Sequence, residues 1–309
     1  DNRQITFIIE QGETVSTVAY HLKRMGLITD PELFRRVVQY WGADKDIQAG
    51  VYTLSPSMTM EEIMRQLQHG GMPTTTVTIP EGWRAEQIAA LLEEVGITSR
   101  EEFIQAVRRG RTDYDFLRDR PPGSPPGLEG FLFPDTYQFP QKANAEQIID
   151  IMLQNWDRRV PPALRKKAAE RKMTLYEVVT LASIVEREAV LDEERPLIAS
   201  VYLNRLKKGM YLQADPTVQY AKGYDSKTGR WWAPMKQEEA ITVVSPYNTF
   251  LHPGLPPGPI CNPGLASIKA VLEPAQTEYL FFYHKGDGSH AFAVTYEEHL
   301  RNQELYGGR

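Results

Sequence analysis

Apolar residues recur at helical spacing through residues 173–216, and this pattern predicts two consecutive helices. Thr174 and Glu177 have the spacing of a capping box, in which each side chain satisfies a backbone N–H at the helix start. Pro196 fits the first turn of the second helix, and Lys207-Lys208-Gly209 predicts its end. One apolar stripe follows the first capping box, at Val178, Leu181, Ala182, Val185 and Ala189.

Two acidic residues, Glu186 and Glu188, fall on opposite edges of this stripe, because successive residues turn by about 100° around a helix. The residues one and two turns before Glu188 are Leu181, Ile184 and Val185. Those in the equivalent places before Glu186 are Val179, Ala182 and Ser183. Glu188 therefore has the bulkier apolar surroundings, and burial keeps a carboxyl protonated, as a general acid requires. The alternative is that both acids are solvated edge residues.

The first hundred residues contain one β-turn-helix pattern twice. Residues 5–9 predict a strand that is followed by a turn and by a helix ending at Gly26, and residues 76–79 begin the same succession, which ends at Gly96. The matched positions, all offset by 70 residues, are Gly12/Gly82, Val18/Ile88, Ala19/Ala89, Leu22/Leu92 and Gly26/Gly96. This regularity predicts an internal duplication.

Between the two copies we expect a helix over 31–41, a strand over 51–54 and a third helix that opens with a Thr59–Glu62 capping box. The residues expected to face inward from the 31–41 helix are Leu33, Phe34, Val37, Val38 and Trp41. Glycines 70 and 71 followed by a proline suggest a joint, and the Pro/Gly-rich stretch 119–127 suggests a second one. We therefore expect divisions 1–72, 73–127 and 128–309.

The second half predicts mostly helices. EGFLFPDTYQF at 129–139 is expected to pack as an extended segment, and helices are expected over 145–160 and 162–171. After Pro216 the composition predicts irregular chain, since residues 245–264 contain six prolines and three glycines. A β-hairpin over 279–294 and a last helix over 299–305 complete an α+β fold.

Composition excludes several classes of protein. The chain has 309 residues, 41% of them hydrophobic, and a net charge of −5 with a pI near 5.8, so it lacks the basic character of a nucleic-acid-binding protein. Its single cysteine, Cys261, cannot form an internal disulfide. We expect no metal site and no cofactor, because the six histidines show no helical H-x-x-x-H spacing and no nucleotide-binding glycine motif is present. The chain contains no G-x-S-x-G motif, the sequence pattern that would indicate a serine enzyme.

Several motifs occur in one order across the second half: EGFLFPDTYQF, LASIVEREA, ASVYLNRLKKGMYLQADPTVQY, SPYNTF and GLPPGPICNPG. In these motifs the chain resembles the YceG-like family of endolytic murein transglycosylases. The resemblance implies two LysM-like β-turn-helix units followed by a mostly helical catalytic domain with a small β-hairpin. It also implies that the second glutamate of E-x-E, Glu188, is the catalytic residue.

The resemblance further implies a setting. Members of the family carry one N-terminal membrane helix and an extracytoplasmic body, so we expect a single-pass membrane anchor upstream of residue 1, because the chain itself has no run of 18 apolar residues. The expected partners are peptidoglycan glycan strands and cell-wall synthases at the membrane, where the enzyme would end strand elongation. The LysM-like units either contact glycan, for example through Trp41 or Trp83, or form a purely structural platform, and the sequence leaves both alternatives open.

The implied reaction needs one carboxyl. In a lytic transglycosylase the 6-hydroxyl of the muramic acid attacks its own C1, and the carboxyl acts first as an acid and then as a base, leaving a 1,6-anhydro end. A hydrolytic muramidase using Glu188 and Asp215 is the alternative, since ordinary glycosidases use two carboxyls. A glycan-binding scaffold without catalysis is a second alternative.

Further residues in the shared motifs are candidates for the substrate cleft. We expect Gln213, Tyr220, Tyr247 and Asn248 to bind substrate, against a structural role for each. Asp215, which precedes a proline, is expected to order a loop or to accept a hydrogen bond from substrate. Asn204-Arg205 is expected to tie a helix to a loop.

Overall fold

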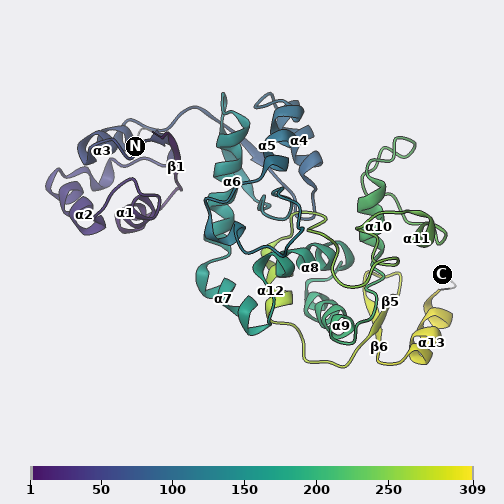
Figure 1. Ribbon diagram of the computed structural model, residues 1–309. Coiled ribbons are helices and arrows are strands. Elements are labelled where there is room, and N and C mark those ends of the chain that lie inside the picture. Colours follow the sequence, from purple (N-terminus) through teal and green to yellow (C-terminus); the bar gives the residue numbers. More distant parts are fainter. Residues whose placement is uncertain (1–2, 308–309) are drawn as a thin grey trace. The chain divides into compact units, whose positions relative to one another are not determined.

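The computed structural model describes residues 3–307, and in that range helices combine with three two-stranded antiparallel sheets in an α+β fold (Figure 1). The chain forms two compact units. The smaller contains the residues up to Ile79 together with Ala89–Phe103 and Thr136–Gln154, and the larger contains the rest. Each unit is therefore built from several stretches of sequence, and the expected divisions at 72/73 and 127/128 stay predictions.

The first part of the smaller unit packs three helices on a two-stranded sheet, in which β1 (Ile5–Ile9) pairs antiparallel with β2 (Gly50–Leu54). The helices are α1 (Val15–Arg24), α2 (Pro31–Tyr40) and α3 (Met60–Gln68). The expected capping box of α3 is confirmed, since Glu62 N donates to Thr59 Oγ1 at 3.2 Å and Thr59 N donates to Glu62 Oε2 at 2.7 Å. The largest core side chains are Phe7, Leu22, Phe34, Leu54, Ile63, Met64 and Leu67.

The inward face of α2 is narrower than expected. Phe34 and Val38 are fully buried, but Leu33 is 50% exposed and Trp41 is 43% exposed, so their predicted inward orientation is wrong. Phe34 and Val38 are four residues apart and share one face of the helix. The side chain of Leu33 is rotated by about 100° around the helix axis from that of Phe34. Trp41 lies beyond the last helical residue, at the C-cap.

The predicted duplication is confirmed at the level of secondary structure. The strand β3 (Thr74–Thr78) and the helices α4 (Ala85–Glu94) and α5 (Arg100–Arg109) follow in the order of β1, α1 and α2, and α4 is α1 displaced by 70 residues. The paired glycines share positive φ angles, +87° and +75° at Gly12 and Gly82, and +72° and +74° at Gly26 and Gly96. The copies differ in their strand partner, because β3 pairs with β4 (Thr136–Pro140), which begins within the expected extended segment 129–139.

In the larger unit, α8 (Leu175–Glu188), α9 (Arg195–Lys207) and α12 (Leu265–Leu272) pack together, with α7 (Pro162–Glu170) against α8 (Figure 1). The helix α6 (Ala145–Arg159) contains the division between the two units. The predicted Thr174–Glu177 capping box of α8 is confirmed. Pro196 lies in the first turn of α9, as predicted.

The central helix is buried on more faces than the single predicted stripe. Every residue of α8 from Leu175 to Val185 is buried apart from Glu177, and Glu186 is buried as well. The extra faces are covered because α7, α9, α12 and the helix α10 (Asp215–Lys222) all pack against this helix. Polar residues on α8 therefore need partners within the protein.

The chain after Pro216 is more regular than expected. Asp215–Lys222 forms the helix α10, Glu239–Thr242 forms the short helix α11, and the predicted irregular stretch is wrong to this extent. Asp-Pro suggests a turn, but Pro216 is equally suited to the first turn of a helix, where its missing N–H costs nothing. The predicted hairpin is confirmed as β5 (Phe281–His284) and β6 (His290–Ala293). The last helix, α13, begins earlier than expected and spans Tyr296–Tyr306.

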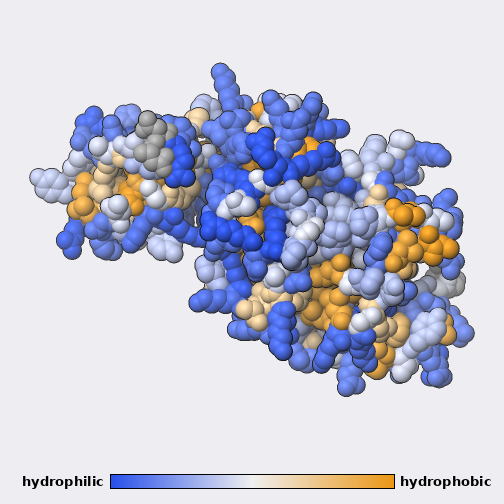
Figure 2. All heavy atoms as spheres, viewed as in Figure 1, coloured by the Kyte–Doolittle hydropathy of each residue, from blue (hydrophilic) through white to orange (hydrophobic). Residues whose placement is uncertain are grey.

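The surface is mixed. No helix among the described residues is both long and apolar enough to cross a membrane. Apolar side chains gather over the α11 segment (Figure 2), where Ile241 is 72% exposed and Val244 is 87% exposed.

The packing of the larger unit can be tested by substituting two of its glycines, Gly130 and Gly209. A Cβ at Gly130 would lie 2.6 Å from Pro259 Cβ and 2.7 Å from Val179 Cγ1, and Gly130 has a φ of +89°. We expect Gly130→Ala to lower the free energy of unfolding by about 3 kcal/mol, because overpacking adds to the cost of a left-handed residue. Urea denaturation measures this.

The control is Gly209→Ala. Gly209 has a φ of +67°, but a Cβ added there would meet open space, so only the backbone cost of about 1 kcal/mol is expected. Equal losses in the two variants would contradict the close approach at Gly130.

Candidate active site

Glu188 is the last residue of α8, half-buried where the helix ends. Its Oε1 accepts a hydrogen bond of 2.6 Å from the hydroxyl of Tyr202, which α9 holds in the interior. Burial raises the pKa of Glu188 to about 7, and the Asp215 charge adds to the rise. The Tyr202 hydrogen bond, Arg205 and Arg187 oppose the rise by stabilising the carboxylate. The carboxyl therefore changes protonation near neutral pH.

The sequence does not mark Tyr202 as a site residue, because it falls among Ile198, Val201 and Leu206 at the apolar spacing of the second predicted helix. Its ring packs edge-on against Phe282 with centroids 5.7 Å apart, and its pKa is raised well above the usual value, mainly by burial. A tyrosine hydroxyl in a buried helix face needs a partner. That need is a sequence-level reason to look for a polar group opposite Tyr202.

Glu186 has a different environment from Glu188. Its Oε2 accepts hydrogen bonds from Gly264 N at 2.9 Å and Ser267 Oγ at 2.8 Å, and its Oε1 lies 3.4 Å from Arg195 Nη1. The residue is only 9% exposed. Glu186 thus ties α8 to α9 and α12. The alternative that both acids are solvated edge residues is wrong.

Asp215 lies close enough to Glu188 for its charge to raise the pKa of that carboxyl. It is the first residue of α10, and desolvation raises its own pKa although the residue reaches the surface; His284 opposes the rise. Gln213, two residues earlier, is exposed and has a left-handed φ of +52°. Such a conformation costs a non-glycine residue free energy, so the surrounding structure must hold it.

Arg205 provides part of that support, and its neighbour Asn204 ties α9 to another stretch of chain. Arg205 Nη1 donates to Leu212 O at 2.6 Å and Arg205 Nε donates to Leu280 O at 2.6 Å. Asn204 Nδ2 donates to Thr277 O at 2.9 Å. The predicted role of Asn204-Arg205 in joining a helix to loops is confirmed.

Tyr220 and Tyr247 lie together farther along the chain, with ring centroids 4.8 Å apart. They line a cavity of about 290 Å³ that also contains Glu129, whose pKa burial raises to about 8. Glu129 accepts from Ala85 N at 3.1 Å and from Asn262 Nδ2 at 2.8 Å, so it joins three stretches of the larger unit.

Asn248 is fully buried. Its Nδ2 donates to Ala240 O at 3.0 Å and to Val243 O at 2.8 Å, and its Oδ1 accepts from Phe250 N at 2.9 Å. The structure thus brings the charge of Asp215 close to Glu188, groups Tyr220 with Tyr247, and commits the Asn248 side chain to ordering its own loop.

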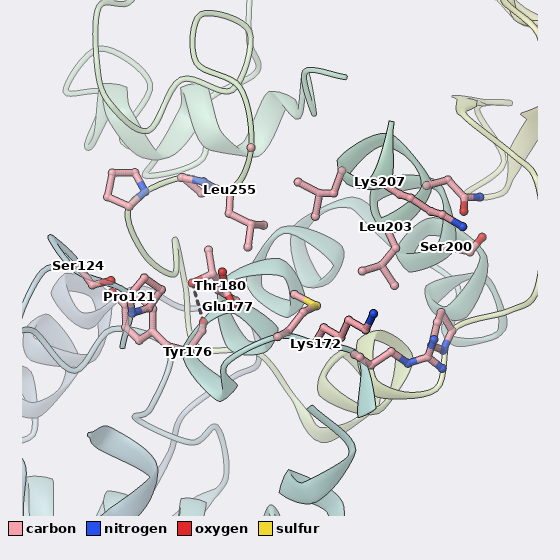
Figure 3. Close-up of a pocket in the computed structure, with 18 of the residues that line it drawn as sticks. Pro121, Ser124, Lys172, Tyr176, Glu177, Thr180, Ser200, Leu203, Lys207 and Leu255 are labelled. Carbon is pink, nitrogen blue, oxygen red and sulfur yellow. Dashed lines mark hydrogen bonds between the residues drawn. The ribbon is translucent and has the colours of Figure 1, made fainter. Parts of the chain in front are cut away.

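A cavity of about 950 Å³ lies elsewhere, beside the first turns of α8 and the end of α9 (Figure 3). Tyr176, Glu177 and Thr180 line it from α8, and Lys207 lines it from α9. Glu188 is not among its lining residues. Size alone therefore does not locate the chemistry, and the perturbed carboxyl is the better guide. Within residues 3–307 no cluster of three or more His, Cys, Asp or Glu side chains could hold a metal ion.

The sequence matches the model of the YceG-like family over residues 7–305. The chain belongs to the YceG-like family. It is 34% identical to an endolytic murein transglycosylase of Bacillus subtilis over 96% of this chain and 83% of that protein. It is 32% identical to an endolytic murein transglycosylase of Streptococcus pneumoniae over 97% of this chain, which spans 58% of that longer relative.

A solved structure supports the family fold. The crystal structure of a yceG-like protein from Listeria monocytogenes matches with a TM-score of 0.62 and 31% identity, over 96% of this chain and 98% of that one. The architecture of this YceG-like chain thus extends over nearly the whole of another member.

The Tyr202 hydrogen bond can be tested by titration. Tyr202→Phe removes a donor that stabilises the ionised carboxyl, so we expect the pKa of Glu188 to rise above about 7. Carbon-13 NMR of labelled glutamate side chains measures the pKa, and Glu188→Gln identifies the resonance. An unchanged or lowered pKa would show that Tyr202 does not stabilise the carboxylate.

The two acids should respond differently to the same substitution. Glu186→Gln replaces the charge that pairs with Arg195, so we expect a loss of about 2 kcal/mol in the free energy of unfolding at pH 7. Activity per folded molecule should be largely retained. Thermal denaturation and activity assays of Glu186→Gln and Glu188→Gln, side by side, check this, and an inactive but fully stable Glu186→Gln would reverse the two assignments.

Proposed function

We propose that this chain is an endolytic murein transglycosylase that cleaves the β-1,4 bond between N-acetylmuramic acid and N-acetylglucosamine and leaves a 1,6-anhydro end. The relatives' names support the class of enzyme. The observation that carries the assignment is Glu188, a desolvated carboxyl with a pKa of about 7 at the end of a buried helix. Strongly perturbed carboxyls of this kind are typical of active sites.

The geometry suits a carboxyl that transfers a proton in both directions. Tyr202 holds Oε1, and Oε2 has no hydrogen bond to any residue in the range 3–307, so it is free to face a substrate. Protonated Glu188 gives its proton to the leaving oxygen of the glycosidic bond. The resulting carboxylate takes the proton of the 6-hydroxyl as that oxygen bonds to C1. A pKa near the working pH favours both steps.

A muramidase is the second candidate, and the electrostatic coupling of Asp215 to Glu188 is the observation that favours it. In an inverting hydrolase, Asp215 would lie about 6.5–9.5 Å from the acid and activate a water between them. A third alternative, a scaffold without catalysis, gives no reason to keep a desolvated carboxyl, because burial of Glu188 disfavours its charged form at and above neutral pH.

The proposed setting is the outer side of the cell membrane. A membrane anchor upstream of residue 1, a position beside cell-wall synthases and a role in ending strand elongation are what the family resemblance supports. The duplicated β-turn-helix units are proposed to be LysM-like and to contact glycan. The exposed Trp41 of the first unit supports such contact.

Glu188→Gln should abolish cleavage of purified peptidoglycan, by at least about 100-fold, because general acid–base catalysis contributes about 10²–10⁴-fold. Release of soluble fragments measures the rate. A variant with substantial activity would exclude Glu188 as the proton donor.

The stability of Glu188→Gln should also depend on pH differently from that of the wild type. The pKa of Glu188 is raised in the folded state, which means that folding favours the protonated carboxyl. The contribution of this group to the stability of the wild type is therefore fully present below the unfolded pKa of about 4.3 and is lost as the pH rises through about 7. Glu188→Gln cannot ionise and should lose less stability over that range. Thermal denaturation at pH 5 and pH 8 shows this.

The ends of the fragments distinguish the reactions. Intramolecular attack gives 1,6-anhydro ends, which are one water lighter in mass than the reducing ends produced by hydrolysis. We expect anhydro ends to predominate, and Asp215→Asn to retain more activity than Glu188→Gln. Mass spectrometry showing mainly reducing ends, together with an inactive Asp215→Asn, would establish the muramidase instead.

A further inference from the structure

Arg187, the neighbour of Glu188, has a guanidinium that makes no hydrogen bond to any residue in the range 3–307. Its Nε is buried without a partner, and its Cζ lies 4.2 Å from the centroid of the Trp232 ring. Burial lowers the pKa of Arg187, and the nearby Cys261, Glu186 and Glu188 side chains oppose this electrostatically. A guanidinium carries five N–H donors, and leaving buried donors unpaired costs free energy. Nε is closed off from a ligand by its burial, but the terminal Nη1 and Nη2 donors are available to one.

Arg84 shows what a structural arginine looks like in the same aromatic group. Its Cζ lies 4.1 Å from the Tyr220 ring centroid and 4.8 Å from that of Trp231. Its donors, however, are used. Nε and Nη2 donate to the carboxylate of Glu86 at 3.1 and 3.3 Å, and Nη1 donates to Tyr220 O at 3.0 Å. Two stacked arginines thus differ in whether the protein supplies acceptors.

The position of Arg187 is set from two sides. Trp232 is held by its Nε1, which donates to Gln87 Oε1 at 3.1 Å, and the ring remains half-buried. On the other side Gly82 leaves room, since a Cβ there would lie 3.1 Å from Arg187 Nη1. The guanidinium is therefore placed before any ligand arrives, which lowers the entropy cost of binding.

We propose that Arg187 and Trp232 form a saccharide subsite, in which Arg187 donates to a carbonyl or carboxylate oxygen of an N-acetylated sugar whose ring lies near the tryptophan. This proposal rests on the proposed function, because it takes glycan as the substrate. The planar guanidinium fork matches the paired or planar oxygens of such groups better than an ammonium does. The charges of Arg187 and Glu188 act on each other, so the subsite lies near enough to Glu188 to orient the sugar next to the bond that is cleaved.

Two oxygen groups on the glycan have this chemistry: the acetamido carbonyl on every sugar, and the lactyl carboxylate on muramic acid. Two probes separate them. A β-1,4-linked tetramer of N-acetylglucosamine has only the acetamido groups, whereas glycan strands stripped of their stem peptides also carry lactyl carboxylates.

The experiment measures binding without turnover, in the full chain carrying Glu188→Gln, by isothermal titration calorimetry. Adding Arg187→Gln should weaken binding by about tenfold or more, the value of a hydrogen bond from a charged donor. Arg187→Lys should recover part of the loss, because it keeps the charge but not the fork. Trp232→Leu should also weaken binding. Circular dichroism checks that each variant is folded.

The matched control is Arg230→Gln, which removes an exposed arginine from the loop that carries Trp232. It should bind both probes as the Glu188→Gln parent does. Weaker binding of both probes by Arg187→Gln assigns the acetamido carbonyl, and weaker binding of the stripped strands alone assigns the lactyl carboxylate.

Two results would overturn the inference, and they differ in what else they affect. Equal affinity of Arg187→Gln and its parent for both probes removes the subsite and leaves the proposed function intact. Failure of the Glu188→Gln parent itself to bind either probe contradicts glycan as the substrate, and the subsite fails with it. In the active enzyme, the subsite predicts that Arg187→Gln raises KM, whereas Arg230→Gln leaves KM unchanged.

Discussion

The enclosure of α8 is the constraint on which the larger unit depends. A helix that is buried on most faces must satisfy its polar side chains within the protein. Ser183 donates to Thr180 O at 2.7 Å and accepts from Ile260 N at 3.0 Å, and Glu186 accepts from Gly264 N. These bonds fix the 260–267 chain, at the end of the proline-rich stretch, against the helix. That chain is thereby ordered although its composition predicts a loop.

The local features of the fold could be predicted because their causes are local. A capping box needs only two residues three positions apart, and both predicted boxes, at Thr59 and Thr174, are present. The duplication was visible because a helix that ends in a left-handed glycine needs that glycine in both copies, and Gly26 and Gly96 have φ angles of +72° and +74°.

The features that could not be predicted depend on contacts between distant residues. Periodicity placed Glu186 and Glu188 on opposite edges of α8. It could not show that Glu186 would contact Ser267 and Arg195, or that Glu188 would accept a hydrogen bond from Tyr202. Leu33 and Trp41 are apolar yet exposed, because the burial of a helix face depends on what packs against it. The sequence does not mark Arg187 as a site residue. That its guanidinium has no hydrogen-bond acceptor among residues 3–307 is a property of the folded chain.

The difference between the two acids explains why incomplete pairing matters for chemistry. Glu186 accepts hydrogen bonds from Gly264 N and Ser267 Oγ and lies beside the Arg195 guanidinium, so its oxygens already have partners within the protein. Among residues 3–307, Glu188 accepts one hydrogen bond, from the Tyr202 hydroxyl, and because desolvation outweighs that bond its pKa is raised to about 7. A second donor would lower that value, so that less of the carboxyl would be protonated and able to give a proton at neutral pH. Without Tyr202 the pKa of Glu188 would be higher, and the carboxyl would give its proton to the leaving oxygen less readily. One bond to a buried hydroxyl thus keeps both protonation states within reach of a single carboxyl, which is what a reaction without an added water requires.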